Sequence, residues 1–140
     1  YRRQRQMCIR DRPYILMSVQ PTLAKMMKGF AREVQQLRDL GAKDIILDPG
    51  FCFGKNLIQN YQIYDEMEKL NVLELPVLVG ISRKSMIYKL LGGDATTSLN
   101  GTTVLDTIAL MKGASILRVH DVKEAAEAVK IVEAMKEGRV

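Results

Sequence analysis

The sequence predicts an α/β protein made of four consecutive strand–helix units. Four short apolar runs alternate with longer amphipathic segments, which is the pattern of parallel strands joined by helices. The runs cover residues 14–19, 44–47, 77–81 and 115–119. Counted from Ile15, Ile45, Val77 and Ile116, they recur at intervals of 30, 32 and 39 residues. Four such units with right-handed crossovers form either a small open sheet or half of an eight-stranded barrel.

The segments between the runs carry apolar residues three or four positions apart, the spacing of a helix that buries one face. They predict helices over residues 23–40, 56–70, 84–91, 98–111 and 122–135. Gly41 follows the first helix and supplies a stop signal. Asp121 is expected to be the N-cap of the last helix, with Glu124 completing a capping box. Because the strands are almost continuously apolar, they are expected to be buried on both faces.

Composition and charge are those of an ordinary globular domain. The 140 residues are 47% apolar and 26% charged. The formal net charge is +5, but the first 12 residues hold five arginines against one acidic residue, so the other 16 basic and 15 acidic side chains nearly balance. No basic stripe remains to follow a phosphate backbone, which argues against a nucleic-acid-binding protein.

Residues 1–12 have neither helical nor strand periodicity and resemble the translation of a sequencing adapter, the alternative being a genuine basic arm. The domain is therefore expected over residues 13–140. Cys8 and Cys52 show no pairing or metal-type spacing, which favours a reducing compartment. No apolar run approaches the roughly 18 residues needed to span a bilayer, and no secretory signal is evident. A cytoplasmic protein without membrane contact is the expectation.

Polar clusters follow three of the four apolar runs. The run 45–47 leads into Asp48-Pro49-Gly50-Phe51-Cys52-Phe53-Gly54-Lys55, the third run into Ser82-Arg83-Lys84-Ser85, and the fourth into Arg118-Val119-His120-Asp121. In α/β proteins, ligands bind at the carboxyl ends of parallel strands. The three clusters are therefore the candidate functional site.

The first cluster has a binding interpretation and a structural one. The carboxylate of Asp48 can accept hydrogen bonds from two neighbouring N–H groups of a planar heterocycle, or it can form an Asx-turn before Pro-Gly. Phe51 and Phe53 can tip over a ligand or pack in the core. Lys55 is expected only to cap or solvate the next helix.

The other two clusters predict anion binding. Arg83 and Lys84 lie at a helix start, where free N–H groups attract a carboxylate or a phosphate, unless Ser82 merely caps the helix. Strand alternation sends Arg118 and His120 to the same face, about 7 Å apart, as two donors for one multi-oxygen anion. A lone histidine is otherwise more often structural.

Together and in this order, these motifs resemble the dihydropteroate synthases of the pterin-binding family, most closely the Bacteroidetes-type forms. The resemblance covers about residues 13–140. It implies a (β/α)8 TIM barrel of which this chain is the carboxy-terminal half, with four βα units. It also implies a cytoplasmic homodimer formed through the segment 122–135, and a Mg²⁺ ion whose ligand lies in the amino-terminal half.

The implied reaction is a transferase step of folate biosynthesis, in which p-aminobenzoate displaces pyrophosphate from 6-hydroxymethyl-7,8-dihydropterin pyrophosphate. The resemblance implies three catalytic residues: Lys84, Arg118 and His120. Asp48 and Lys84 would bind the pterin, and Phe53 and Ser85 would bind p-aminobenzoate. The pyrophosphate would be held by Arg83, Arg118 and His120.

Two positions depart from the family pattern. Cys52 stands where glycine is usual, and residues 17–22 differ from the commoner form of that segment. Two alternatives stay open, namely a pterin-dependent methyltransferase of the same barrel family and a non-catalytic anion-binding α/β module. The chain alone is expected to be inactive, because half a barrel leaves two open sheet edges and lacks part of the site.

Overall fold

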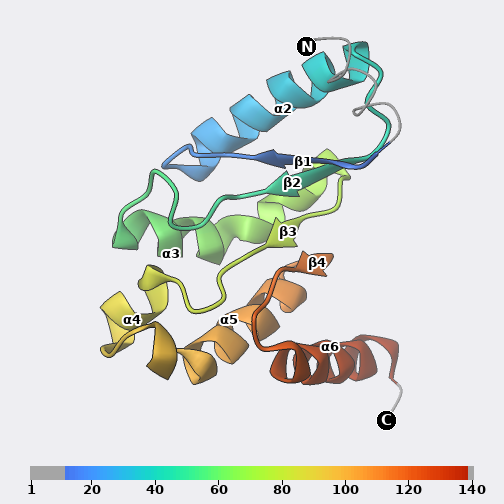
Figure 1. Cartoon of the computed structure of the whole chain (residues 1–140). Helices are drawn as coiled ribbons and strands as arrows, with labels where there is room; N and C mark the ends of the chain where they lie inside the picture. Colours follow the sequence, from blue (N-terminus) through green and yellow to red (C-terminus); the bar gives the residue numbers. More distant parts are fainter. Residues whose placement is uncertain (1–11, 139–140) are drawn as a thin grey trace.

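The strands of the computed structural model, which describes residues 12–138, are parallel and follow one another in chain order (Figure 1). They are β1 (Tyr14–Met17), β2 (Ile45–Asp48), β3 (Leu78–Val79) and β4 (Ile116–Leu117). Tyr14 lies opposite Ile45 in the β1–β2 pair, and Leu78 lies opposite Ile116 in the β3–β4 pair. A parallel bridge from Leu47 to Val77 joins the two pairs. The predicted α/β arrangement is therefore confirmed.

The helices agree with the predicted segments to within a few residues at their ends. They are α2 (Leu23–Asp39), α3 (Leu57–Glu66), α4 (Ser85–Leu91), α5 (Leu99–Met111) and α6 (Val122–Glu137). The segment predicted as one helix over 56–70 leaves α-helical geometry at Glu66 and continues as the 3-10 helix η1 (Met67–Leu73). The interval before β4 is the longest because α4, the short 3-10 helix η2 (Ala95–Thr97) and α5 all lie within it.

The helix starts show which sequence signals act as caps. Thr22 caps α2 through its side chain, and Asn56 forms a capping box with Gln59 at the start of α3. The capping box predicted for Asp121 and Glu124 is wrong. Asp121 is the N-cap residue of α6, but its side chain makes no capping hydrogen bond because both carboxylate oxygens accept from Arg83.

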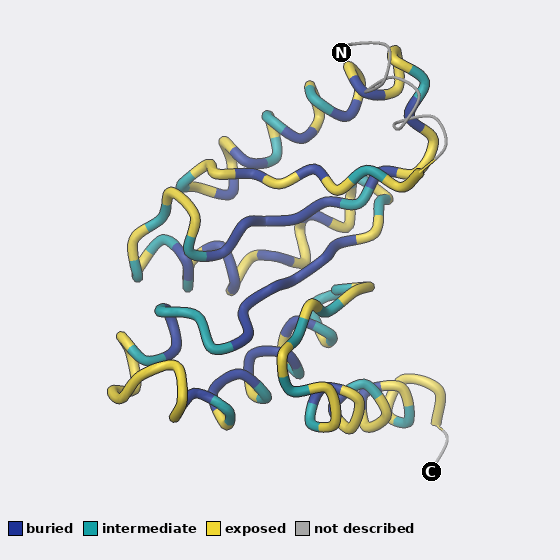
Figure 2. The backbone as a smooth tube through the Cα atoms, viewed as in Figure 1, coloured by how far each residue is buried: buried dark blue, intermediate teal, exposed yellow. Residues whose placement is uncertain are grey.

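The core lies between the two inner strands and the helices that cover them (Figure 2). Leu47 of β2 and Val79 of β3 are completely buried, as are Met26 and Phe30 of α2. The outer strands differ from the expectation that all four are buried on both faces. In β1, Ile15 is 52% and Met17 is 41% exposed, and Ile116 in β4 is 37% exposed. In β1 the exposed Ile15 and Met17 alternate with the buried Leu16, so only one face of this strand is covered. Neither β1 nor β4 has a strand on its outer side among residues 12–138.

No helix among the described residues is long and apolar enough to cross a membrane. The interpretation of residues 1–12 as a foreign tail falls almost entirely outside the described residues and stays a prediction.

Asp106 on α5 is a buried acid without a full set of partners. Only 2% of the residue is exposed, and its Oδ1 atom has no hydrogen-bond partner. Burial raises the pKa of Asp106 to about 6, and the negative charge of Asp121 adds to the shift. An ionised carboxylate in such a place destabilises the folded state, because the free energy lost when it leaves water exceeds the free energy gained from its contacts in the protein.

We therefore expect the free energy of unfolding to depend on Asp106 between its ordinary pKa of 3.8 and about 6. Because the folded-state pKa is the higher one, the wild-type protein loses stability as the pH rises through this window. Asp106→Asn keeps the shape of the side chain without the charge. Above pH 6 its free energy of unfolding should therefore exceed that of the wild type by up to about 3 kcal/mol, and below pH 4 the two should differ little. Urea unfolding across pH 4–8 measures this difference.

The exposed Asp65 on α3 offers the matched control. Asp65→Asn should show no such pH-dependent gain, and an equal gain in both variants would contradict the assignment to Asp106.

Candidate functional site

The ends of β3 and β4 enclose a small cavity of about 240 Å³. Its lining is Gly80, Ser82, Lys84, Arg118, Val119 and His120. Arg118 and Lys84 carry cationic groups, His120 carries an imidazole, and none of the lining side chains is a carboxylate. The cavity is thus suited to an anion with several oxygens, and it unites three of the residues that the sequence singled out.

Arg118 and His120 enter the cavity from the residues that follow β4. The backbone N–H of Arg118 donates to the Val79 carbonyl over 3.0 Å, so the strand pairing continues one step beyond β4. The guanidinium of Arg118 makes no hydrogen bond or ion pair with any residue among 12–138, and its donors remain available. His120 is exposed, and both its backbone N–H and its Nδ1 atom contact the Ser82 hydroxyl.

Lys84 links this cavity to the end of β2. Its Nζ donates to the Phe51 carbonyl over 3.1 Å and lies 4.8 Å from the centre of the Phe53 ring, a cation–π contact. Burial lowers the pKa of Lys84, and the positive charge of Arg118 lowers it further, while Cys52 and Asp48 act in the opposite sense. A lysine with a lowered pKa loses its proton more readily than an ordinary one, yet this ammonium still has two N–H groups beyond the Phe51 bond.

Asp48 is buried at the carboxyl end of β2, with 5% of the residue exposed. Its Oδ1 atom accepts a hydrogen bond from the Gly50 N–H over 2.9 Å, so the Asx-turn considered from the sequence is present. Its Oδ2 atom accepts no hydrogen bond from the described residues. Asp48 does not line the 240 Å³ cavity, although it is near enough to Lys84 to influence its pKa. The turn and a binding role are therefore compatible, because each uses a different oxygen.

The loop after Asp48 separates the two phenylalanines. Phe51 is buried against Tyr64, with ring centres 4.9 Å apart, whereas Phe53 is 44% exposed beside Lys84. The expectation that Lys55 only caps or solvates the next helix is wrong. Its Nζ donates to the carbonyls of Gly50, Phe53 and Ser18, which fastens the loop to the segment after β1, and Asn56 caps the helix instead. Burial lowers the pKa of Lys55.

The Arg83 guanidinium is hydrogen-bonded to other residues of the chain. Its Nε and Nη2 donate to the two oxygens of Asp121, both over 2.9 Å, and its Nη1 donates to the carbonyls of Ala95 and Thr96. The hydrogen bonds to the Asp121 carboxylate raise the pKa of Arg83, and the same hydrogen bonds lower the pKa of Asp121. Four of the five N–H groups are thereby used. Contact of Arg83 with pyrophosphate stays a prediction, and its visible role is to tie the β3 end to the start of α6.

Ser85 is the first residue of α4 and is half-buried. Its hydroxyl makes no hydrogen bond with the described residues, and it does not line the cavity. Its predicted contact with p-aminobenzoate stays a prediction. Among residues 12–138, no three His, Cys, Asp or Glu side chains gather as a metal site requires. The described residues do not by themselves fit Mg²⁺, and none is assigned to it.

Sequence reasoning missed several residues that hold the site together. The sequence predicts Ser82 only as a helix cap, but α4 begins at Ser85 and Ser82 contacts His120 instead. Asn60 was overlooked, although its Oδ1 accepts from the Cys52 N–H over 2.8 Å. The sequence signal for Asn60 is its helical spacing, because it lies three positions after Leu57 and four before Tyr64. The structure shows that this amide is buried.

Comparisons with known proteins show which family the chain resembles. The model of the pterin-binding enzyme family matches residues 7–120. The chain is 44% identical over 113 residues to the dihydropteroate synthase of Escherichia coli strain K12, which covers 79% of this chain and 40% of that protein.

Solved structures give the same result. The Yersinia pestis dihydropteroate synthase with a pterine–sulfa conjugate superposes with a TM-score of 0.87 at 41% identity, covering 90% of this chain and 52% of that one. The Xanthomonas albilineans dihydropteroate synthase with 4-aminobenzoic acid superposes with a TM-score of 0.88 at 27% identity, covering 94% and 52%. The chain therefore spans about half the length of the proteins that it matches.

The departure from glycine at Cys52 has a measurable consequence. Cys52 has a φ of +71°, a left-handed conformation that costs a residue with a Cβ about 1–2 kcal/mol. We expect Cys52→Gly to be more stable than Cys52→Ala by about 1 kcal/mol, because both remove the thiol but only alanine keeps the strain. Thermal unfolding of the two variants side by side tests this, and a more stable alanine variant would contradict the strained geometry.

Proposed function

The chain belongs to the pterin-binding enzyme family, and from this premise we propose that it is the carboxy-terminal part of a dihydropteroate synthase. Such an enzyme joins p-aminobenzoate to 6-hydroxymethyl-7,8-dihydropterin pyrophosphate and releases pyrophosphate. The single observation that carries the proposal is the cavity lined by Lys84, Arg118 and His120, at the carboxyl ends of parallel strands and free of carboxylates.

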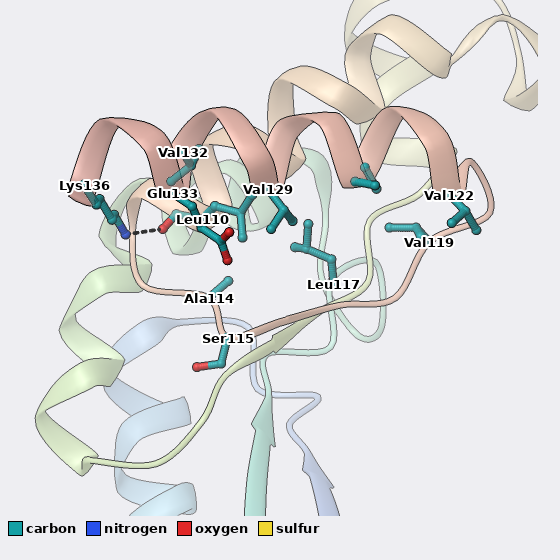
Figure 3. Close-up of a pocket in the computed structure, with 12 residues that line it drawn as sticks. Leu110, Ala114, Ser115, Leu117, Val119, Val122, Val129, Val132, Glu133 and Lys136 are labelled. Atoms are coloured by element: carbon teal, nitrogen blue, oxygen red, sulfur yellow. Dashed lines mark hydrogen bonds between the residues drawn. The ribbon is translucent and has the colours of Figure 1, made fainter. Parts of the chain in front are cut away.

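We propose further that the four strand–helix units are half of a (β/α)8 barrel. Both outer strands lack an outer neighbour among the described residues, and the relatives carry about as much chain again. A groove of about 370 Å³ also runs between α5, β4 and α6 (Figure 3). Figure 3 shows Leu117, Val122 and Val129 directed into it, with Lys136 bonded to the Leu110 carbonyl at one end. An apolar groove beside an open strand is suited to a further strand and helix.

In the proposed reaction, the amine nitrogen of p-aminobenzoate forms a C–N bond to the exocyclic carbon of the pterin. The C–O bond to pyrophosphate breaks with its electron pair on the leaving oxygen, and the amine loses a proton to solvent. Arg118 and His120 supply donors where that negative charge develops, which lowers the barrier without a protein acid or base. The cavity supports these roles, because no acidic residue lines it.

The pterin and p-aminobenzoate assignments use the neighbouring residues. The Oδ2 of Asp48 would accept N–H donors of the aminopyrimidine edge, and Lys84 would contact the pterin ring. Phe53, exposed beside Lys84, would provide an apolar wall for p-aminobenzoate, with Ser85 near its carboxylate. A cytoplasmic location, a homodimer through the α6 helix, and Mg²⁺ binding by another part of the protein complete the proposal.

The anion site is testable in the chain as it stands. We expect inorganic pyrophosphate to bind, and Arg118→Gln to weaken binding about 10- to 100-fold, because a charged hydrogen bond is lost. Arg38→Gln on α2, an exposed arginine outside the cavity, is the matched control and should bind as wild type does. Isothermal titration calorimetry measures both. Equal affinities in the two variants would exclude Arg118 from the anion site.

The half-barrel proposal predicts that the purified chain alone has no synthase activity, because half of the barrel is missing. Co-expression with the amino-terminal half of the Yersinia pestis enzyme should restore formation of dihydropteroate, measured with both substrates. Turnover by the chain alone would contradict the half-barrel. Pyrophosphate binding without any restored turnover would favour a non-catalytic anion-binding module.

A further inference from the structure

The register between β3 and β4 extends into the cavity. Val79 lies opposite Leu117, and the Arg118 N–H donates to the Val79 carbonyl. Continuing by one residue at a time places Gly80 beside Arg118 and Ser82 beside His120. Both pairs are close in the structure: the Arg118 guanidinium lies near Gly80, and the His120 ring contacts the Ser82 hydroxyl. Two residues at the end of β3 therefore face two residues at the end of β4.

The Arg118 guanidinium lies close to Gly80. Gly80 does not have a positive φ, so its backbone conformation is open to any residue. A Cβ built on it would lie 3.2 Å from both Nε and Nη2 of Arg118 and 3.5 Å from Cζ, with no other atom closer. The guanidinium therefore lies close to the place that a side chain at position 80 would occupy, against the buried backbone of Gly80.

The Ser82 hydroxyl contacts both the backbone and the ring of His120. The Ser82 residue is only 6% exposed, and its hydroxyl accepts from the His120 backbone N–H over 3.2 Å and lies 3.0 Å from Nδ1. If the hydroxyl donates to Nδ1, every one of these groups is satisfied. The alternative, with the proton on Nδ1, leaves the Ser82 O–H without an acceptor among the described residues, which is costly for a buried donor.

We propose that Gly80 and Ser82 are positioning residues for the Arg118 and His120 pair. Gly80 seats the guanidinium, and Ser82 fixes the imidazole as the tautomer with its proton on Nε2. The inference rests on the proposed function, because this pair is the one assigned to pyrophosphate. Its consequence is that both donors are oriented before the anion arrives, which reduces the free energy needed to order them on binding.

His120 is the only histidine in the sequence, so its ring can be observed without interference. In ¹⁵N-labelled protein, at a pH where the ring is neutral, two-bond ¹H–¹⁵N spectra should show the proton on Nε2. Ser82→Ala should shift the two nitrogen signals toward the averaged values of mixed tautomers, and Ser82→Thr, which keeps the hydroxyl, should restore them. Ser115→Ala, an exposed serine outside the cavity, should leave the spectrum unchanged.

The second arm measures pyrophosphate affinity by calorimetry in variants shown to unfold cooperatively. Gly80→Ala and Ser82→Ala should each weaken binding about three- to tenfold, the loss expected when a hydrogen-bonding group is misplaced. In an Arg118→Gln background, Gly80→Ala should cause no further loss of affinity, because it acts only through the guanidinium.

The outcomes separate the two proposals. A proton on Nδ1 in the wild type, or a Ser82→Ala spectrum identical to wild type, would overturn the role of Ser82. Equal affinities in wild type and Gly80→Ala, with pyrophosphate bound, would overturn the role of Gly80. Absence of pyrophosphate binding in the wild type would overturn the proposed function and with it the role of Gly80, while the tautomer measurement, which needs no ligand, would still decide on Ser82.

Discussion

The parallel pairing of β3 with β4 is the constraint on which the site depends. Only two residue pairs, Leu78 with Ile116 and Val79 with Leu117, form this ladder, yet they set the register of everything that follows. A slip by one residue would send Arg118 and His120 to the opposite face, away from Lys84. The short ladder is supported from both sides, because Val79 is fully buried and the Arg83–Asp121 pair ties the two strand ends together beyond it.

The second element of the site is the loop after Asp48, which hydrogen bonds hold in one conformation. Cys52 has a strained left-handed conformation, and the loop keeps it through bonds made by Asn60 and Lys55. The benefit is positional, because the loop buries Phe51 and leaves Phe53 exposed beside Lys84. Strain of this kind persists only where surrounding contacts determine the backbone, and it concentrates at functional sites.

Charge is arranged so that the cavity stays cationic. Asp121 follows His120 directly in the sequence, and an unpaired carboxylate there would repel an anion. Arg83 pairs with it, which leaves the Arg118 guanidinium free of acidic partners among residues 12–138. Two arginines that look alike in the sequence thus have different tasks, one neutralising a neighbour and one facing the cavity.

The order of the four strand–helix units, the helix segments and the three polar clusters could all be predicted from the sequence, because periodicity and composition are local properties of the chain. Lys84, Arg118 and His120 line one cavity, as expected for the ends of neighbouring parallel strands, whereas Asp48 from the first cluster does not line it. Only the tertiary structure decided three other features. These are the exposure of β1 and β4, the three hydrogen bonds from Lys55 to carbonyl groups, and the pairing of Arg83 with Asp121. Arg83 and Asp121 are 38 positions apart, as are Ser82 and His120, and no local pattern specifies which donor finds which acceptor across that distance.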